Sequence, residues 1–266
     1  MRIGKYLFAV LLVVAASSCK SQYSAILESN DVPLKYSEAM RLFEAKKYSK
    51  AAELFESLSI ISGGLPMDDT VNFYWGYSNY LYKDYSTAEG NLQKFIDTYP
   101  LSPFIDKAKF LRLDCLYHST YRYTLDQRPT YSAISAISQF ILESPDSEYA
   151  GECMKMMDDL KQRLEEKAFQ GAFLYYHMED YKAAHYALKN VLKENAENRY
   201  REEILYYTAM SAYKYALNSI STKQRERYLV FVDDYFNVVS EYPDSSRRRS
   251  LDPLYRRVQK ILEKNN

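Results

Sequence analysis

The chain has few of the residues that interrupt helices. Its 266 residues include only seven glycines and eight prolines. These two residues punctuate turns and end helices, so their scarcity disfavours a fold rich in tight turns. Tyrosine, in contrast, occurs 28 times. Because a tyrosine ring packs while its hydroxyl group stays hydrated, this residue suits extended contact surfaces. The composition predicts long helices joined by short turns, with a large amphipathic surface.

The chain also has no excess of charge of either sign, since 35 basic residues balance 35 acidic ones. Without Arg2 and Lys5, which lie in a segment expected to be removed, 33 basic residues face 35 acidic ones. Nucleic-acid-binding domains present a basic surface. The charge balance therefore predicts that nucleic acid is not a partner.

Residues that bind metals or act as nucleophiles are scarce and scattered. His177 and His185 lie eight positions apart, and His118 is far from both, so none pairs at the three- or four-residue spacing of helical ligands. Cys115 and Cys153 fall in separate helical segments and are expected to be buried free thiols. No glycine-rich phosphate loop is present either. The sequence predicts no enzyme, no metal site and no cofactor.

The N-terminus has the three parts of a secretory signal. Arg2 and Lys5 give a positive start, residues 6–16 are all apolar, and small side chains at 16–18 precede Cys19. Eleven apolar residues are too few to span a bilayer, which needs about 20. The segment is therefore expected to be a signal peptide.

Small residues directly before a cysteine resemble a bacterial lipobox, in which a diacylglycerol is attached to the thiol. Ala16 occupies the position where that motif most often has Leu. We expect residues 1–18 to be a lipoprotein signal peptide and Cys19 to carry the lipid. Plain secretion, with Cys19 present by chance, is the alternative. Residues 19–34 lack periodicity and are expected to form the lipidated end and a flexible tether.

A repeated pattern follows the tether. The stretches "KKYSKAAELF", "KDYSTAEGNL" and "EDYKAAHYAL" each place Ala three residues after Tyr and a large apolar residue four residues later. The first two copies are 37 residues apart, close to the 34-residue period of a tetratricopeptide (TPR) helix-turn-helix unit. Two antiparallel helices approach closely only where a side chain is small. Gly76 provides such a position in the second copy, whereas Phe231 replaces the Ala in the fifth.

Proline-containing stretches separate the units, and a final helix closes the chain. Asp252 is a candidate N-cap and Pro253 a first-turn residue of this helix. The predicted fold is therefore all-α, an α-solenoid of about five TPR repeats with a C-terminal capping helix. Residues 35–147 hold repeats one to three, and 148–266 hold repeats four and five with the capping helix.

Stacked repeats create a groove lined by the first helix of each pair. Tyr74, Tyr77 and Tyr80 lie on such a helix and are candidates for binding a peptide; the alternative is that they pack as core. The same alternatives apply to four tyrosines of the fifth repeat: Tyr206, Tyr207, Tyr213 and Tyr215. The lone Trp75 is expected to belong to the core.

Two basic clusters offer a second kind of surface. Arg199 and Arg201 open the fifth repeat, and Arg247 and Arg248 precede the last helix. Such charges either keep a face in water or dock onto an acidic partner or lipid headgroups.

The lipobox, the repeats and two particular stretches resemble the BamD family, lipoproteins of the machinery that assembles β-barrels in the bacterial outer membrane. Residues 77–114 are similar to the family's second repeat running into its third. Residues 144–184 are similar to its junction between repeats three and four, including the long helix "LKQRLEEKAFQGAFLYY".

This resemblance implies a lipid-anchored scaffold on the periplasmic face of the outer membrane. It implies that the C-terminal repeats dock on the POTRA domains of the barrel subunit BamA, beside other Bam lipoproteins. The N-terminal repeats would receive C-terminal segments of unfolded outer-membrane proteins. The family's contact arginine falls closest to Arg201, or to Arg199, because the preceding loop differs in length.

Two other functions fit a periplasmic helical lipoprotein. One is a TPR scaffold for another envelope or cell-wall complex, which would leave barrel assembly intact. The other is a carbohydrate-binding lipoprotein of a nutrient-uptake system, although such a protein needs a platform of exposed Trp residues.

Overall fold

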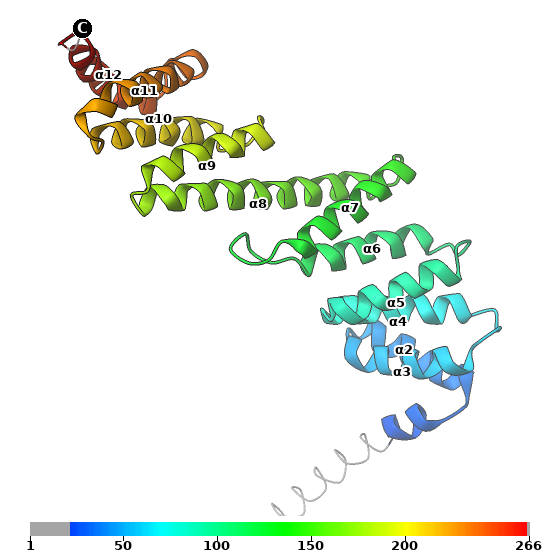
Figure 1. Ribbon diagram of the computed structural model, residues 1–266. Helices are drawn as coiled ribbons and strands as arrows, with labels where there is room; N and C mark the ends of the chain where they lie inside the picture. The colour runs from blue at the N-terminus through cyan, green and yellow to red at the C-terminus, as the bar shows by residue number, and fades with distance from the viewer. Residues whose placement is uncertain (1–21, 265–266) are drawn as a thin grey trace, which may run out of the picture. The chain divides into compact units, whose positions relative to one another are not determined.

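The computed structural model describes residues 22–264, and every regular element in that range is a helix (Figure 1). The bounds are α2 Val32–Glu44, α3 Tyr48–Ile61, α4 Asp68–Tyr82, α5 Tyr85–Thr98, α6 Ile105–His118, α7 Arg128–Glu143, α8 Ala150–His177, α9 Tyr181–Glu194, α10 Arg201–Leu217, α11 Ser221–Glu241 and α12 Ser246–Lys264. Residues 22–28 are also helical.

Consecutive helices pair into five hairpins, α2/α3, α4/α5, α6/α7, α8/α9 and α10/α11, with α12 left over as the predicted cap. The all-α, TPR-like fold predicted from the repeats is thereby confirmed for the described residues. The long helix expected within residues 144–184 is α8, of 28 residues.

The described chain divides into two compact units. Unit 1 runs up to Tyr121 and includes Arg128–Met157, whereas unit 2 comprises Arg122–Gln127 and the residues from Asp158 onward. The boundary falls inside α8, about ten residues after the position expected from the sequence. The connection at 122–127 belongs to unit 2 because Lys167 donates hydrogen bonds to the carbonyl groups of Tyr123 and Leu125, at 2.9 and 2.8 Å.

The expected tether is folded from residue 22 onward, which corrects the prediction for residues 22–34. Tyr23, Ile26 and Leu27 pack against the core of the first hairpin, and α2 begins at Val32. A two-turn helix lacks a sequence period long enough to detect, and tertiary contacts decide its conformation. Cys19 and the predicted signal peptide lie outside the described residues.

The second hairpin shows why the repeat needs a small residue. A Cβ atom placed on Gly76 of α4 would lie 3.0 Å from Leu92 Cδ2 of α5. Leu92 and Ala88 are fully buried in the same cluster, so the two helices touch at this point. Glycine is required here by close approach and not by backbone conformation.

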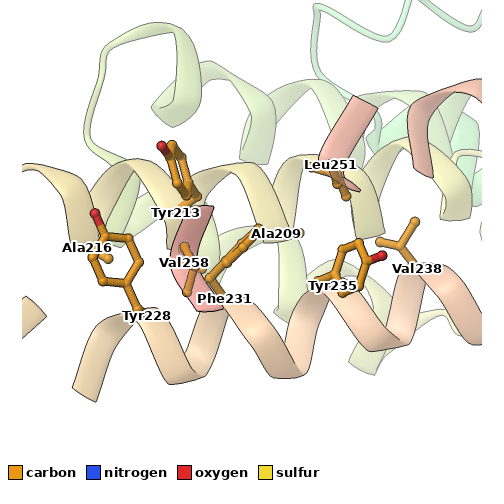
Figure 2. Close-up of a cluster of buried hydrophobic side chains, with 10 residues drawn as sticks. Ala209, Tyr213, Ala216, Tyr228, Phe231, Tyr235, Val238, Leu251 and Val258 are labelled. Atoms are coloured by element: carbon orange, nitrogen blue, oxygen red, sulfur yellow. The ribbon is translucent and has the colours of Figure 1, made fainter. Parts of the chain in front are cut away.

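The fifth hairpin reaches the same result with different side chains. Phe231 of α11 replaces the usual Ala and is fully buried, while α10 presents Ala209, Ala212 and Ala216. In Figure 2 the Phe231 ring lies between α10 and α11, directed toward Tyr213 and Ala209. In this hairpin the small residues therefore lie on the first helix, α10, and the large one lies at the Ala position of the second helix.

Helix α12 closes the core of the fifth hairpin, as predicted. Leu251 and Val258 are fully buried against it, and Leu254, Ile261 and Leu262 pack around them. The predicted N-cap is wrong, since α12 starts at Ser246 and contains Pro253 in its interior. Asp252 instead accepts a hydrogen bond from the Tyr235 hydroxyl at 2.8 Å, which ties α12 to α11.

Three of the turns between paired helices use a left-handed backbone at a residue with a side chain. Lys46, Lys83 and Glu179 have φ values of 58°, 68° and 61°. Each lies shortly before the Tyr that opens the next helix, so the repeated "Tyr" motif marks the point where the chain reverses. Asp84 and Asp180 then cap the following helices through the amides of Thr87 and Ala183.

Cys115 and Cys153 are free and fully buried, as predicted. Burial disfavours the thiolate and raises the pKa of Cys115 to about 12 and that of Cys153 to about 11. Both thiols therefore stay protonated and act as small apolar side chains of unit 1.

Candidate functional site

The predicted peptide-binding tyrosines form a row along α4. The ring centroids of Tyr74 and Tyr77 are 6.5 Å apart, and those of Tyr77 and Tyr80 are 6.2 Å apart. All three side chains are half-buried. The row continues through Tyr85, whose ring stacks on His118 with centroids 4.6 Å apart. We call Tyr74, Tyr77, Tyr80 and Tyr85 the aromatic row.

Two members of the aromatic row have polar partners on α6. The Tyr80 hydroxyl donates a hydrogen bond to Asp114 Oδ2 at 2.6 Å, and Lys107 Nζ lies 4.3 Å from the centroid of the Tyr77 ring. Burial, together with the bond to Asp114, raises the pKa of Tyr80, so its hydroxyl remains a donor. An aromatic surface with a cation above one ring can bind an apolar side chain beside a carboxylate.

Tyr74 has a different environment. Its ring contacts Phe43, Phe55 and Phe104, at centroid distances of 4.9, 5.7 and 6.1 Å. These rings join the first hairpin to the second, so Tyr74 is largely a packing residue. Trp75 also packs against the first hairpin's core, as expected.

The tyrosines of the fifth repeat divide between core and surface. Tyr213 is 4% exposed and meets Phe231 at a centroid distance of 5.4 Å, which makes it core (Figure 2). Tyr215 is half-buried beneath Arg227, whose guanidinium carbon lies 4.0 Å from the ring centroid. Tyr206 and Tyr207 are half-buried and in contact, 5.0 Å between centroids.

The arginines at the start of the fifth repeat already have acidic partners. Arg199 forms ion pairs with Asp158 and, at 3.5 Å, with Glu165 of α8. Arg201 makes two hydrogen bonds to Glu241, at 2.6 and 2.8 Å. The bond to Glu241 raises the pKa of Arg201. Arg199 therefore binds the fourth repeat, whereas Arg201 joins the start of α10 to the end of α11.

The second basic cluster is also engaged within the chain. Arg247 pairs with Glu203 at 2.8 Å and with Glu202 at 3.7 Å, and Arg248 pairs with Asp252 at 3.4 Å. Arg201 and Arg247 thus meet carboxylates at the same end of the fifth hairpin, while Arg199 faces α8. Their side chains remain 30 to 40% exposed, so an acidic partner can still reach them.

One buried charged cluster is not among the residues predicted from the sequence. Asp234 of α11 is 2% exposed and lies 2.7 Å from His185 Nε2 and 2.9 Å from Lys189 Nζ, both on α9. No local pattern could reveal it, because His185 and Asp234 are 49 residues apart. The cluster connects the second helices of repeats four and five.

The chemistry of the remaining histidines is limited. His118 pairs with Asp114 at 3.5 Å, and His177 packs edge-on against Phe173. Within residues 22–264, no group of three or more His, Cys, Asp or Glu side chains could hold a metal ion. Likewise, none of the helices in that range is both long and apolar enough to cross a bilayer.

Comparison with known proteins gives the family. The family described as "Outer membrane lipoprotein" (YfiO) matches residues 30–172, more than half of the chain. The outer membrane protein assembly factor BamD of Rickettsia prowazekii (strain Madrid E) is 26% identical over 218 residues, which cover 80% of this chain and 85% of the relative.

A second relative is the outer membrane protein assembly factor BamD of Caulobacter vibrioides (strain ATCC 19089 / CIP 103742 / CB 15). It is 23% identical over 159 residues, 59% of this chain and about half (52%) of the relative. The matched range 30–172 includes the aromatic row and residues 77–114, together with residues 144–172 of the second stretch on which the predicted resemblance depended. The chain belongs to the YfiO family of outer membrane lipoproteins, which confirms the resemblance to BamD.

Proposed function

We propose that this chain is a non-catalytic assembly factor for outer-membrane β-barrel proteins, anchored by a lipid on Cys19 and facing the periplasm. The observation that carries the proposal is the match to the outer membrane lipoprotein family over residues 30–172, together with two relatives named as outer membrane protein assembly factors. A helical repeat fold agrees with this role, because stacked hairpins present extended surfaces to partners.

In this proposal, unit 1 receives the C-terminal segment of an unfolded barrel protein on the aromatic row. Tyr77 and Tyr80 offer partly exposed rings, and Lys107 places a positive charge 4.3 Å above one of them. A peptide that ends in an aromatic residue would stack on the rings while its terminal carboxylate approaches the lysine.

Unit 2 docks, in the same proposal, on the POTRA domains of a BamA-like barrel subunit, beside other Bam lipoproteins. Arg199, Arg201, Arg247 and Arg248 are the candidate contacts. Each retains exposed surface despite its intramolecular pair, and an acidic partner would exchange with, or add to, the existing carboxylates. Such charge pairs fix register and speed association more than they add affinity.

Depletion of the protein in its own host tests the function. We expect the levels of folded barrel proteins in the outer membrane to fall before growth stops, and a BamA-like subunit to dominate crosslinks formed by the tagged chain. Normal barrel levels with crosslinks to cell-wall proteins would support the envelope-scaffold alternative instead.

A binding assay tests the peptide site separately. Tyr77→Ala and Lys107→Glu should each weaken binding of a fluorescent peptide that ends in an aromatic residue by about five- to tenfold, because each removes one stacking or charge contact. Tyr131→Ala is the control, since Tyr131 is 61% exposed on α7, outside the aromatic row. Equal binding by all three variants would contradict the assignment of the row.

A further inference from the structure

The helix at residues 22–28 is fixed to the first hairpin by polar bonds as well as by packing. Lys35 is 2% exposed, and its Nζ donates to the Leu27 carbonyl oxygen at 2.9 Å and to Ser57 Oγ at 2.7 Å. The Tyr23 hydroxyl donates to Glu53 Oε2 at 2.7 Å. A buried lysine with two acceptors holds the start of the described chain in one position.

This attachment limits how far the fold can lie from a lipid on Cys19. Gln22 is three residue steps from Cys19. An extended chain spans at most about 3.6 Å per step, or about 11 Å in all. Gln22 lines a surface hollow together with Tyr23 and Lys47. The surface next to this hollow must therefore lie close to the membrane that holds the lipid.

That neighbouring surface is strongly basic. A second hollow shares Lys47 and Lys50 with the first, and adds Lys46, Tyr82 and Lys83. We call Lys46, Lys47, Lys50, Tyr82 and Lys83 the anchor-side surface. Five basic side chains and one acidic side chain line the two hollows together.

The charges of the anchor-side surface are available to a partner. All four lysines are exposed, and none lies within 4 Å of a carboxylate among the described residues. The single acidic residue, Glu38, is held by two hydrogen bonds of 2.6 Å to Arg41. Lys50 lies over the Tyr23 ring, 5.0 Å from its centroid, so its ammonium group is not neutralised.

The surface also carries an aromatic ring suited to a bilayer interface. Tyr82 is 57% exposed and lines the second hollow together with Lys50 and Lys83. Tyrosine is enriched at the level of lipid headgroups because its ring is apolar and its hydroxyl is polar. Clustered lysines beside a membrane anchor attract anionic headgroups in the same region.

We propose that the anchor-side surface binds the headgroups of anionic phospholipids, and so orients unit 1 on the membrane. The inferred closeness of this surface to the membrane rests on the lipid at Cys19 in the proposed function. The affinity of the surface for anionic lipid is independent of that lipid and can be measured on a chain that lacks it.

Vesicle binding of the mature chain, residues 19–266 with Cys19→Ser, tests the proposal. We expect binding to vesicles of 30% phosphatidylglycerol in phosphatidylcholine, little binding to pure phosphatidylcholine, and release by 0.5 M salt. Each lysine near an anionic surface contributes about fivefold to the partition constant. Replacing all four lysines by Gln should therefore weaken binding by about 600-fold if the four contributions add, and Tyr82→Ala by a few-fold.

A matched quadruple variant controls for net charge. Lys155, Lys161, Lys193 and Lys260 are exposed elsewhere on the chain, and their replacement by Gln removes the same charge. This control should bind as the unsubstituted chain does, and circular dichroism should show that both quadruple variants are folded. Equal weakening of both variants, or equal binding to neutral and anionic vesicles, would overturn the proposal.

The vesicle experiment and the depletion experiment can fail independently of each other. If depletion leaves barrel assembly intact while the vesicle result holds, the assembly role fails and the lipid surface stands. If barrel levels fall on depletion but the four lysines do not affect vesicle binding, the assembly role stands and the lipid surface is refuted.

Discussion

The second and fifth hairpins reach close packing with different side chains. In the second, Gly76 of the first helix admits Leu92 of the second. In the fifth, the second helix carries the bulky Phe231, and alanines on the first helix make room for it. Both contacts are fully buried. Close packing therefore does not require Ala at the repeat's Ala position, which holds Ala88 in the second hairpin and Phe231 in the fifth.

The largest expected loss of stability comes from removing the Phe231 ring from the core of the fifth hairpin. Phe231→Ala removes a fully buried ring between α10 and α11, and the facing alanines are too short to fill the space. We expect the free energy of unfolding to fall by about 3–5 kcal/mol. Urea denaturation followed by circular dichroism measures it. Phe236→Ala, on the same helix but 49% exposed, should cost less than about 1 kcal/mol. Similar losses for both variants would mean that α11 is not packed as described.

The next largest loss of stability is expected from adding a side chain at Gly76 in the second hairpin. Gly76→Val places two methyl groups against Leu92 and should destabilise the chain by about 1–3 kcal/mol. Combining it with Leu92→Ala should cost less than the sum of the two single changes, because the smaller side chain frees the volume. If the two changes in the free energy of unfolding simply added, Gly76 and Leu92 would not be in steric contact.

Gly90→Ala tests the opposite case on the same helix pair. The added Cβ meets nothing within 4 Å, so the substitution should stabilise α5 by about 0.5–1 kcal/mol.

The same contrast separates what the sequence could predict from what it could not. The Tyr-to-Ala spacing predicted hairpins one, two and four because it is local and repeats. Phe231 breaks this spacing in the fifth hairpin, which was predicted from its helix lengths and its neighbours. The compensating Ala209 and Ala212 lie on another helix. The site residues follow this division. Tyr77 could be chosen from its place on a first helix, but the partner of Arg201 could not, because Glu241 lies 40 residues away.

Thiol chemistry gives the smallest effect, and Cys115 of α6 reports on the cluster that α6 shares with the second hairpin. Cys115 packs in one cluster with Leu92 and Phe73, and burial raises the pKa values of Cys115 and Cys153 to about 12 and 11. Native protein at pH 8 should label with a thiol reagent far more slowly than denatured protein. Gly76→Val should accelerate labelling at Cys115, whereas Gly90→Ala should not.

The raised thiol pKa values also set a pH dependence. The unfolded chain ionises its thiols near their ordinary pKa of about 8.5, whereas the native chain does not until about pH 11. Their contribution to stability is therefore complete below about pH 8.5 and is lost as the pH rises toward 11–12. Urea titrations at pH 7.5 and pH 10 measure this. Greater stability at pH 10 would contradict it.

The left-handed turns have a consequence for the stability of the chain. Lys46 and Lys83 occupy φ values of 58° and 68°, where glycine is free of strain and a residue with a Cβ atom pays about 1 kcal/mol. For stability alone, glycine would be the better residue at both turns. Replacing them by glycine should raise the melting temperature while it erases two positive charges. The two lysines thus keep positive charge in the anchor-side surface at a cost in stability.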